Sequence, residues 1–130
     1  MTKAAAMFQF FSSFGLTAYE EDSVYAMAMQ GQAPSYPYLT YEGKTDFFGD
    51  HNDTPLSFSL WYRSSSWTEV NAKTQQISAA IGRVGMIIKC DGGYILIKRS
   101  SPWGQNMGDD SDDMIRRNVH SLSVRFYTND

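Results

Sequence analysis

The clearest pattern in the chain is a pair of apolar runs on either side of a tight-turn sequence. The runs are Met86 to Cys90 and Tyr94 to Arg99, and the tripeptide between them is Asp91-Gly92-Gly93. Aspartate and glycine tolerate the positive φ angles that tight hairpin turns require. The pattern therefore predicts a β-hairpin.

Two earlier segments alternate between apolar and polar residues, as strands with one buried face do. In Leu56 to Arg63, the side chains of Phe58, Leu60 and Tyr62 share one face, and polar residues and a tryptophan share the other. Tyr38 to Glu42 alternates more weakly, which predicts a half-exposed strand. Prolines and turn-forming residues separate these segments from the rest of the chain.

A last strand is predicted near the end of the sequence. Leu122, Val124 and Phe126 alternate with polar residues there. The apolar alternation slips by one residue near Asn118 or Val119, and such a slip indicates a bulge or another irregularity.

Residues 1–37 are predicted to form a helix followed by an extended connection. Thr2 is a suitable N-cap and Gly15 a suitable C-terminal residue. Apolar side chains recur between them at three- and four-residue intervals, at Ala4, Met7, Phe8, Phe11 and Phe14. This aromatic face packs either into the core or against a neighbouring subunit.

A second helix is predicted from Trp67 to Ile81. Ser66 and Glu69 have the spacing of a capping box, in which the serine hydroxyl accepts from the glutamate N–H and the carboxylate bonds back to the serine N–H. Val70, Ile77 and Ile81 follow on one face, and Gly82 ends the helix.

The order of these elements is helix, two strands, helix and three strands. It predicts an α+β fold with a mainly antiparallel sheet of about five strands and helices on one face. The length of 130 residues predicts a single domain, residues 1–130.

Composition and charge narrow the classes of function. Hydrophobic residues make up 42% of the chain and charged residues 19%, which indicates a packed protein with much uncharged polar surface. A net charge of −3 argues against specific nucleic-acid binding. No apolar stretch approaches the roughly 20 residues of a membrane span, and Cys90, the single cysteine, excludes an internal disulfide. We expect a cytoplasmic protein without a membrane partner.

Candidate catalytic residues are few. His51 and His120 have no spacing that would make them joint metal ligands, and no nucleophile-elbow motif surrounds any serine. We therefore expect neither an enzyme nor a cofactor. The carboxylates of a glycine-containing loop lack the spacing of a calcium site and lie near basic strand ends. Together with two tryptophans they form the candidate interface residues Asp109, Asp110, Asp112, Asp113, Arg116, Arg117, Trp61 and Trp103.

The segments YPYLTYE, LSFSLWYRSSSWTEVNAKTQQI, CDGGYILIKRSSPW and RRNVHSLSVRFYT, in this order, resemble the tail terminator proteins of bacteriophages with long, non-contractile tails, also called tail completion or head–tail joining proteins. The resemblance implies a structural virion protein that assembles in the host cytoplasm. It implies a homohexameric ring that caps the tail tube and contacts the tube protein and the head connector or stopper, with DNA passing through the ring. The strand from Met86 to Cys90 or the strand from Leu56 to Arg63 would supply the sheet edge between subunits.

A second hypothesis belongs to a different class. The chain would then be a small, non-catalytic module that binds a ligand or a partner in a pocket. The two hypotheses differ in the expected molar mass in solution.

Overall fold

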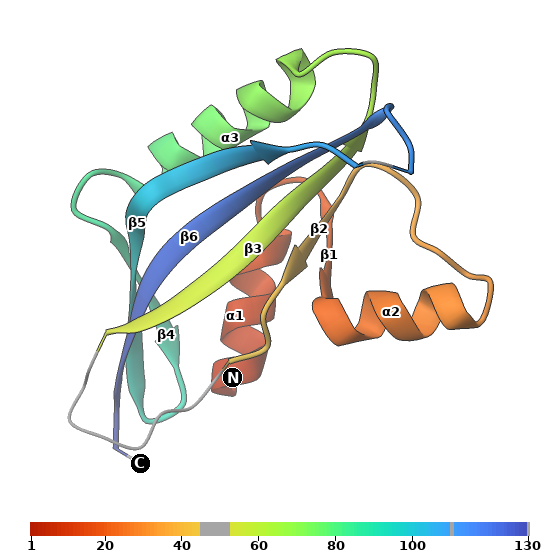
Figure 1. The fold of residues 1–130 in the computed structure, drawn as a ribbon. Coiled ribbons are helices and arrows are strands. Elements are labelled where there is room, and N and C mark those ends of the chain that lie inside the picture. Colours follow the sequence, from red (N-terminus) through yellow and green to blue (C-terminus); the bar gives the residue numbers. More distant parts are fainter. Residues whose placement is uncertain (45–52, 110, 130) are drawn as a thin grey trace.

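A curled β-sheet organises the part of the chain that the computed structural model describes, which is residues 1–44, 53–109 and 111–129 (Figure 1). These residues form three helices and six strands, whose bounds are α1 (Lys3–Ser12), β1 (Thr17–Glu20), α2 (Glu21–Met29), β2 (Tyr38–Tyr41), β3 (Thr54–Arg63), α3 (Thr68–Ile81), β4 (Met86–Cys90), β5 (Gly93–Met107) and β6 (Ile115–Thr128). The predicted α+β class is confirmed, with six strands in place of about five.

The strand order across the sheet is β1-β2-β3-β6-β5-β4. Only β1 and β2 pair in parallel among the described strands, and the other neighbours are antiparallel. The predicted hairpin is confirmed, because β4 and β5 pair from Cys90 opposite Gly93 to Met86 opposite Ile97. Strand β4 therefore lies at one end of the sheet. The prediction that β3 supplies a free edge is wrong, since β3 lies between β2 and β6.

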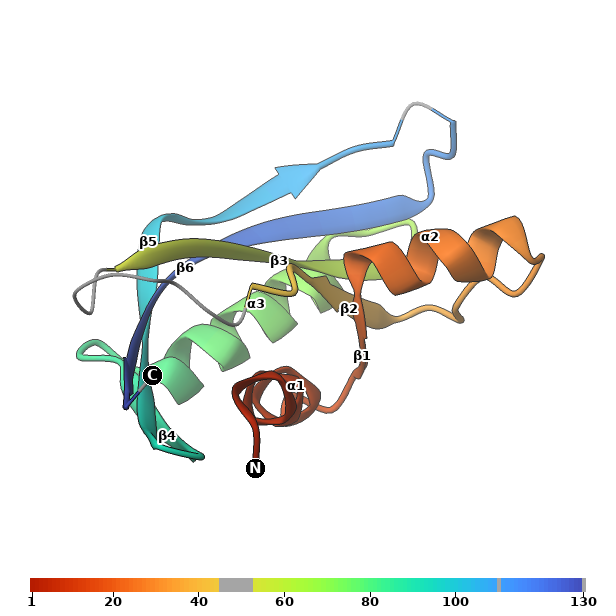
Figure 2. The same ribbon diagram turned by 90° about the horizontal axis from the view of Figure 1, so that it is seen from below.

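Helices α1 and α3 cover one face of the sheet, and α2 stands beyond the β1 end (Figure 2). Phe11 of α1 stacks on Tyr41 with ring centroids 4.4 Å apart and lies 5.4 Å from the ring of Phe58. From α3, the side chains of Val70, Ile77 and Ile81 are buried, as predicted. The core is thus an aromatic and aliphatic layer between two helices and the sheet.

The first helix begins as predicted but presents a different face. Thr2 Oγ1 accepts the N–H of Ala5 at 3.1 Å and so caps α1. Ala4 and Phe8 are exposed, although they were expected on the apolar face. Helix α1 ends at Ser12, before the predicted Gly15, and its buried side chains are those of Ala6, Met7, Phe10 and Phe11. Phe14 lies beyond the helix and is buried.

The predicted extended connection before residue 37 is wrong, because it contains β1 and α2. Strand β1 has only four residues and depends on pairing with β2. Alanine and methionine favour helix α2, and Glu21 and Asp22 lie in its first turn, where carboxylates interact well with the helix dipole. None of its nine side chains is buried, so it lacks the apolar periodicity that identifies a packed helix.

Two strand predictions are corrected by burial. All four residues of β2 are buried, so this strand is not half exposed. Strand β6 is continuous, and its buried positions include Asn118 and His120 before Leu122. The irregularity expected near Asn118 lies instead in the partner strand, where the register of β5 shifts between Arg99 and Gly104.

The start of α3 also differs from the prediction. The Ser66 hydroxyl accepts the N–H of Thr68 at 3.1 Å, and Trp67, the N-cap residue, makes no side-chain cap bond. The predicted capping box is therefore not formed, because the helix begins one residue later than the box requires. Gly82 ends α3 as expected, with a φ of 82° and an N–H bonded to the carbonyl of Ser78.

We predict that Ile77→Ala lowers the free energy of unfolding by about 2–5 kcal/mol, because the removed atoms leave a cavity in a closely packed core. The Ile77 side chain is fully buried against the sheet. Urea denaturation followed by circular dichroism measures this loss. Gln76→Ala, at an exposed position on the same helix, is the control, and a loss for Ile77→Ala below about 0.5 kcal/mol would contradict the packing of α3.

Candidate functional site

An aromatic and cationic row crosses the face of the sheet opposite α1 and α3. Tyr38, Trp61 and Arg117 are register partners on β2, β3 and β6. The rings of Tyr38 and Trp61 stack at 5.9 Å, and the Arg117 guanidinium lies 4.5 Å from the Trp61 ring centroid. Arg117 also donates two hydrogen bonds of 3.2 Å to Ser59 Oγ. Two of the predicted interface residues, Trp61 and Arg117, are therefore in contact within one chain.

The acidic residues lie at the tip of the β5–β6 hairpin, where several of them bond within the chain. Asp112 forms an ion pair with Arg63, which lowers the pKa of Asp112. Asp109 accepts hydrogen bonds from the hydroxyl and the N–H of Ser111, at 2.6 and 2.8 Å, and these bonds lower the pKa of Asp109. Asp110 lies outside the described residues.

Arg116 ties the same hairpin tip to the start of α3. Its guanidinium donates to the backbone carbonyls of Asp113 and Ser65, at 2.6 and 3.2 Å, and lies 5.2 Å from the ring centroid of Trp67. The charges of this region thus already fix the hairpin against β3 and α3. A contact with another molecule would have to use the tip as a preformed surface or exchange these bonds.

Trp103 lies on the other face of the sheet, away from Trp61. Its half-buried ring meets His120 edge-on at 4.8 Å and Phe58 at 5.9 Å. The buried indole Nε1 has no hydrogen-bond partner among the described residues. The structure therefore places the two predicted interface tryptophans in separate environments.

A polar cluster beneath α3 was missed by the sequence analysis. His120 is fully buried and its Nε2 lies 3.2 Å from Thr74 Oγ1, which itself donates to the carbonyl of Val70 at 2.9 Å. Because the threonine proton is used in that bond, Nε2 must be the donor, and the neutral tautomer carries its proton on Nε2. Nδ1 is left without a hydrogen-bond partner in the described chain.

Gly104 permits this cluster to form. It pairs with His120 across the β5–β6 ladder, and an added Cβ would lie 2.8 Å from Asn118 Oδ1. Asn118 uses its amide to donate to Asn106 Oδ1 at 2.6 Å. The signal in the sequence was the unbroken alternation of Asn118 and His120 with the later apolar residues, which the apolar Val119 concealed.

The environment of His120 is unsuited to proton transfer at neutral pH. Burial lowers the pKa of His120 to about 4, although the Asn118 backbone offsets part of this effect. The imidazole is therefore neutral near pH 7 and is closed off from solvent. Its evident role is to hold α3 on β6.

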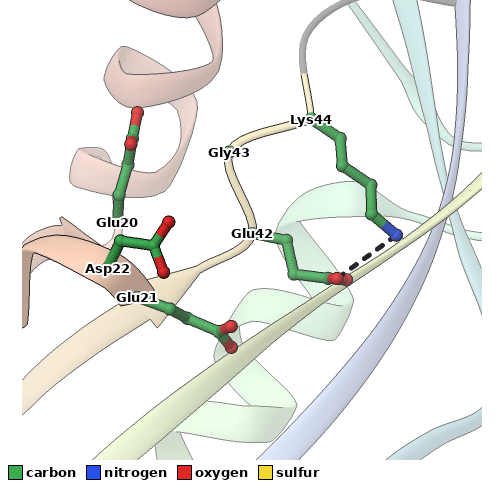
Figure 3. Close-up of a pocket in the computed structure, with 6 residues that line it drawn as sticks. All are labelled: Glu20, Glu21, Asp22, Glu42, Gly43 and Lys44. Atoms are coloured by element: carbon green, nitrogen blue, oxygen red, sulfur yellow. Dashed lines mark ion pairs between the residues drawn. The ribbon is translucent and has the colours of Figure 1, made fainter. Parts of the chain in front are cut away.

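A solvent-facing pocket lies between the start of α2 and the end of β2 (Figure 3). Its volume is about 280 Å³, and its lining residues are Glu20, Glu21, Asp22, Glu42, Gly43 and Lys44. The carboxylates of Glu20, Glu21 and Asp22 point in different directions in Figure 3. Within the described ranges, no group of three histidine, cysteine or acidic residues is placed to hold a metal ion.

Glu42 in this pocket is structural. It accepts hydrogen bonds from the N–H and hydroxyl of Ser57, at 2.6 and 2.9 Å, and pairs with Lys44 at 3.2 Å. Burial by itself raises the pKa of Glu42, but these bonds outweigh burial and leave the pKa below its usual value. The pocket therefore offers a surface of negative charge around a fixed β2–β3 contact.

The two ends of the sheet differ in chemistry. At the β1 end, Glu20, Glu21 and Asp22 are exposed beside α2. At the β4 end, Arg83, Lys89 and Lys98 are exposed. In the described part of the chain, no helix is long and apolar enough to cross a membrane.

We predict that the free energy of unfolding falls with acidification between pH 6.5 and pH 4, partly because unfolded His120 binds a proton that the folded protein excludes. The folded pKa of about 4 lies below the ordinary value of 6.5, so this stabilisation is complete above pH 6.5 and decreases as pH falls. His120 is expected to account for a decrease of about 2–3 kcal/mol in the free energy of unfolding between pH 7 and pH 4.5.

Urea denaturation at several pH values measures this effect, with His120→Gln as the comparison because glutamine keeps an amide donor but does not titrate. The variant should show a weaker pH dependence over this range. Equal pH dependence in both proteins would contradict the buried, neutral histidine.

No family model, no curated protein and no solved structure matches this chain.

Proposed function

We propose that this protein is a ring-forming structural subunit that caps the tail tube of a long-tailed, non-contractile bacteriophage and joins the tail to the head connector. The observation that carries the proposal is the open sheet with two unlike ends, β1 beside an acidic helix and β4 beside exposed basic residues. Unlike ends at opposite sides of one subunit favour head-to-tail contacts, and such contacts close into rings when the rotation permits.

The resemblance to tail terminators supports this proposal through the elements that its segments form. YPYLTYE contains β2, and LSFSLWYRSSSWTEVNAKTQQI contains most of β3 and the larger part of α3. CDGGYILIKRSSPW spans the hairpin turn and much of β5, and RRNVHSLSVRFYT lies in β6. The similar segments thus make up neighbouring strands and the helix that covers them.

We propose that the β5–β6 hairpin tip contacts the tail tube or the connector. The tip joins the ends of the two long strands β5 and β6. The tip is held in a defined conformation by Arg63, by Arg116 and by the interactions of Asp109 and Asp112. Met107 beside the tip is 43% exposed. A preorganised loop loses less conformational entropy on binding than a free one.

A phage that lacks this gene is predicted to make tails of irregular length that do not join heads, because no ring ends the growing tube. Electron microscopy of lysates with and without a complementing plasmid measures tail length and attachment. Tails of uniform length joined to heads in the mutant lysate would refute the proposed function.

The molar mass of the purified protein should rise with concentration toward that of a closed ring, and light scattering after size exclusion measures it. Attraction between the unlike ends is partly electrostatic, so added salt should lower the associated fraction. A protein that stays monomeric at every concentration and restores no mutant tails would favour the alternative of a small partner-binding module.

We also propose that the protein has no catalytic activity and uses no cofactor. The support is the environment of His120, which is neutral and buried; His51 lies outside the described residues. Esterase, phosphatase and nuclease substrates, with and without divalent ions, should show no turnover above a heat-treated sample. Turnover that His51→Ala or His120→Ala abolishes would overturn this proposal.

A further inference from the structure

Helix α2 carries a solvent-facing stripe with a charged end and an apolar end. Tyr25 is 72% exposed and Met29 is 74% exposed, one turn apart on the same side of the helix. Glu21 and Asp22 begin the stripe and form no ion pair with any described residue. Figures 1 and 2 both show α2 away from α1 and α3, so neither of the other helices in the described residues covers this stripe.

A groove at the opposite end of the sheet has the complementary chemistry. It lies between α1 and β4, has a volume of about 430 Å³ and is lined by Met1, Ala6, Gln9, Phe10, Ser13, Met86, Ile88 and Lys89. Most of these side chains are apolar. Lys89 is exposed and has no ion-pair partner within the described ranges.

The two features suit one another in polarity and in charge. A tyrosine and a methionine are residue types that are enriched in the buried centres of protein interfaces. The acidic start of α2 would lie beside Lys89, and opposite charges placed at an interface favour one partner and one orientation. A contact between α2 and the groove would therefore have an apolar centre and, at one side of it, a pair of opposite charges.

We propose that α2 of one copy docks in the α1–β4 groove of the next copy, with Tyr25 and Met29 on the apolar lining and Glu21 and Asp22 beside Lys89. The proposal rests on the self-association proposed above and names its surfaces. Because β1 and β4 are the two ends of the sheet, the contact is heterologous: each copy uses its α2 on one side and its groove on the other.

Cysteine cross-linking tests this contact directly. Tyr25→Cys and Gln9→Cys are combined in a Cys90→Ser background, concentrated and oxidised, and analysed on a non-reducing gel. The double variant should give a ladder of multimers, and reduction should collapse the ladder. Each single variant should stay monomeric on the gel, and a mixture of the two should stop at a dimer.

The matched control replaces Gln9→Cys by Phe8→Cys. Phe8 is 50% exposed on the same helix but does not line the groove. The combination with Tyr25→Cys should lose the ladder. An equal ladder would mean that cross-linking reflects random collision and would overturn the proposal.

Charge exchange gives an independent test. Glu21→Lys with Asp22→Lys in one protein, and Lys89→Glu in another, should each reduce self-association measured by light scattering. Mixing them should restore it, because a junction between one variant and the other again joins opposite charges. Failure of the mixture to associate better than either variant would contradict the assigned charge contact.

The outcomes of these experiments distinguish a failure of the proposed contact from a failure of the proposed function. Dimers from Tyr25→Cys alone would indicate an α2–α2 contact and overturn the proposal, as would the absence of any cross-link in the double variant. Rings without the ladder would overturn the assigned surfaces but leave the tail-ring function standing. A ladder together with normal tails in the gene-deletion phage would leave the contact standing and refute the function.

Discussion

The burial of Phe58 at the centre of β3 is the contact on which the other layers of the molecule depend. Its ring lies 5.4 Å from Phe11 in α1, 4.5 Å from His120 in β6 and 5.9 Å from Trp103 in β5. One fully buried side chain thus joins a helix to three strands. Its stacking on an imidazole also explains why a polar residue is tolerated in the core, since the histidine face is packed while its Nε2 is bonded to α3.

This arrangement positions the surfaces that we propose for contacts with other molecules. Helices α1 and α3 occupy one face of the sheet, and their packing leaves β1 and β4 at the two ends. The β5 strand must pass close to Asn118 and His120, which requires glycine at position 104. Beyond that point, β5 and β6 continue as a hairpin that projects from the core, with a tip held by arginine contacts. Core packing therefore positions both the sheet ends and the tip.

Electrostatic groups near the tip and at the ends have different roles. Asp112 and Arg116 are bonded to neighbouring elements of the same chain and stabilise the local conformation. Glu21, Asp22 and Lys89 form no ion pair with described residues. Binding through an unpaired exposed charge costs less free energy than binding through a charge whose internal hydrogen bond or ion pair must first break. This difference favours the sheet ends over the hairpin tip for the contact between copies that we propose.

The sequence by itself determined the elements that are specified by turn residues, helix caps and apolar periodicity within their own segments. These are the Asp91-Gly92 turn with its flanking strands, the Thr2 cap, the apolar face of α3 and its end at Gly82, and hence the α+β class. Two of the candidate interface residues, Trp61 and Arg117, are in contact within one chain because β3 pairs with β6.

Tertiary structure decided the remainder. Strand β1 forms only because β2 lies beside it, and α2 has no buried face to reveal it. Asn118 and His120 look like surface residues in the sequence but occupy the core, because Thr74 and Asn106 supply partners from distant segments. Hydrogen bonds and edges of this kind depend on which strands become neighbours, and a local pattern of apolar and polar residues does not contain that information.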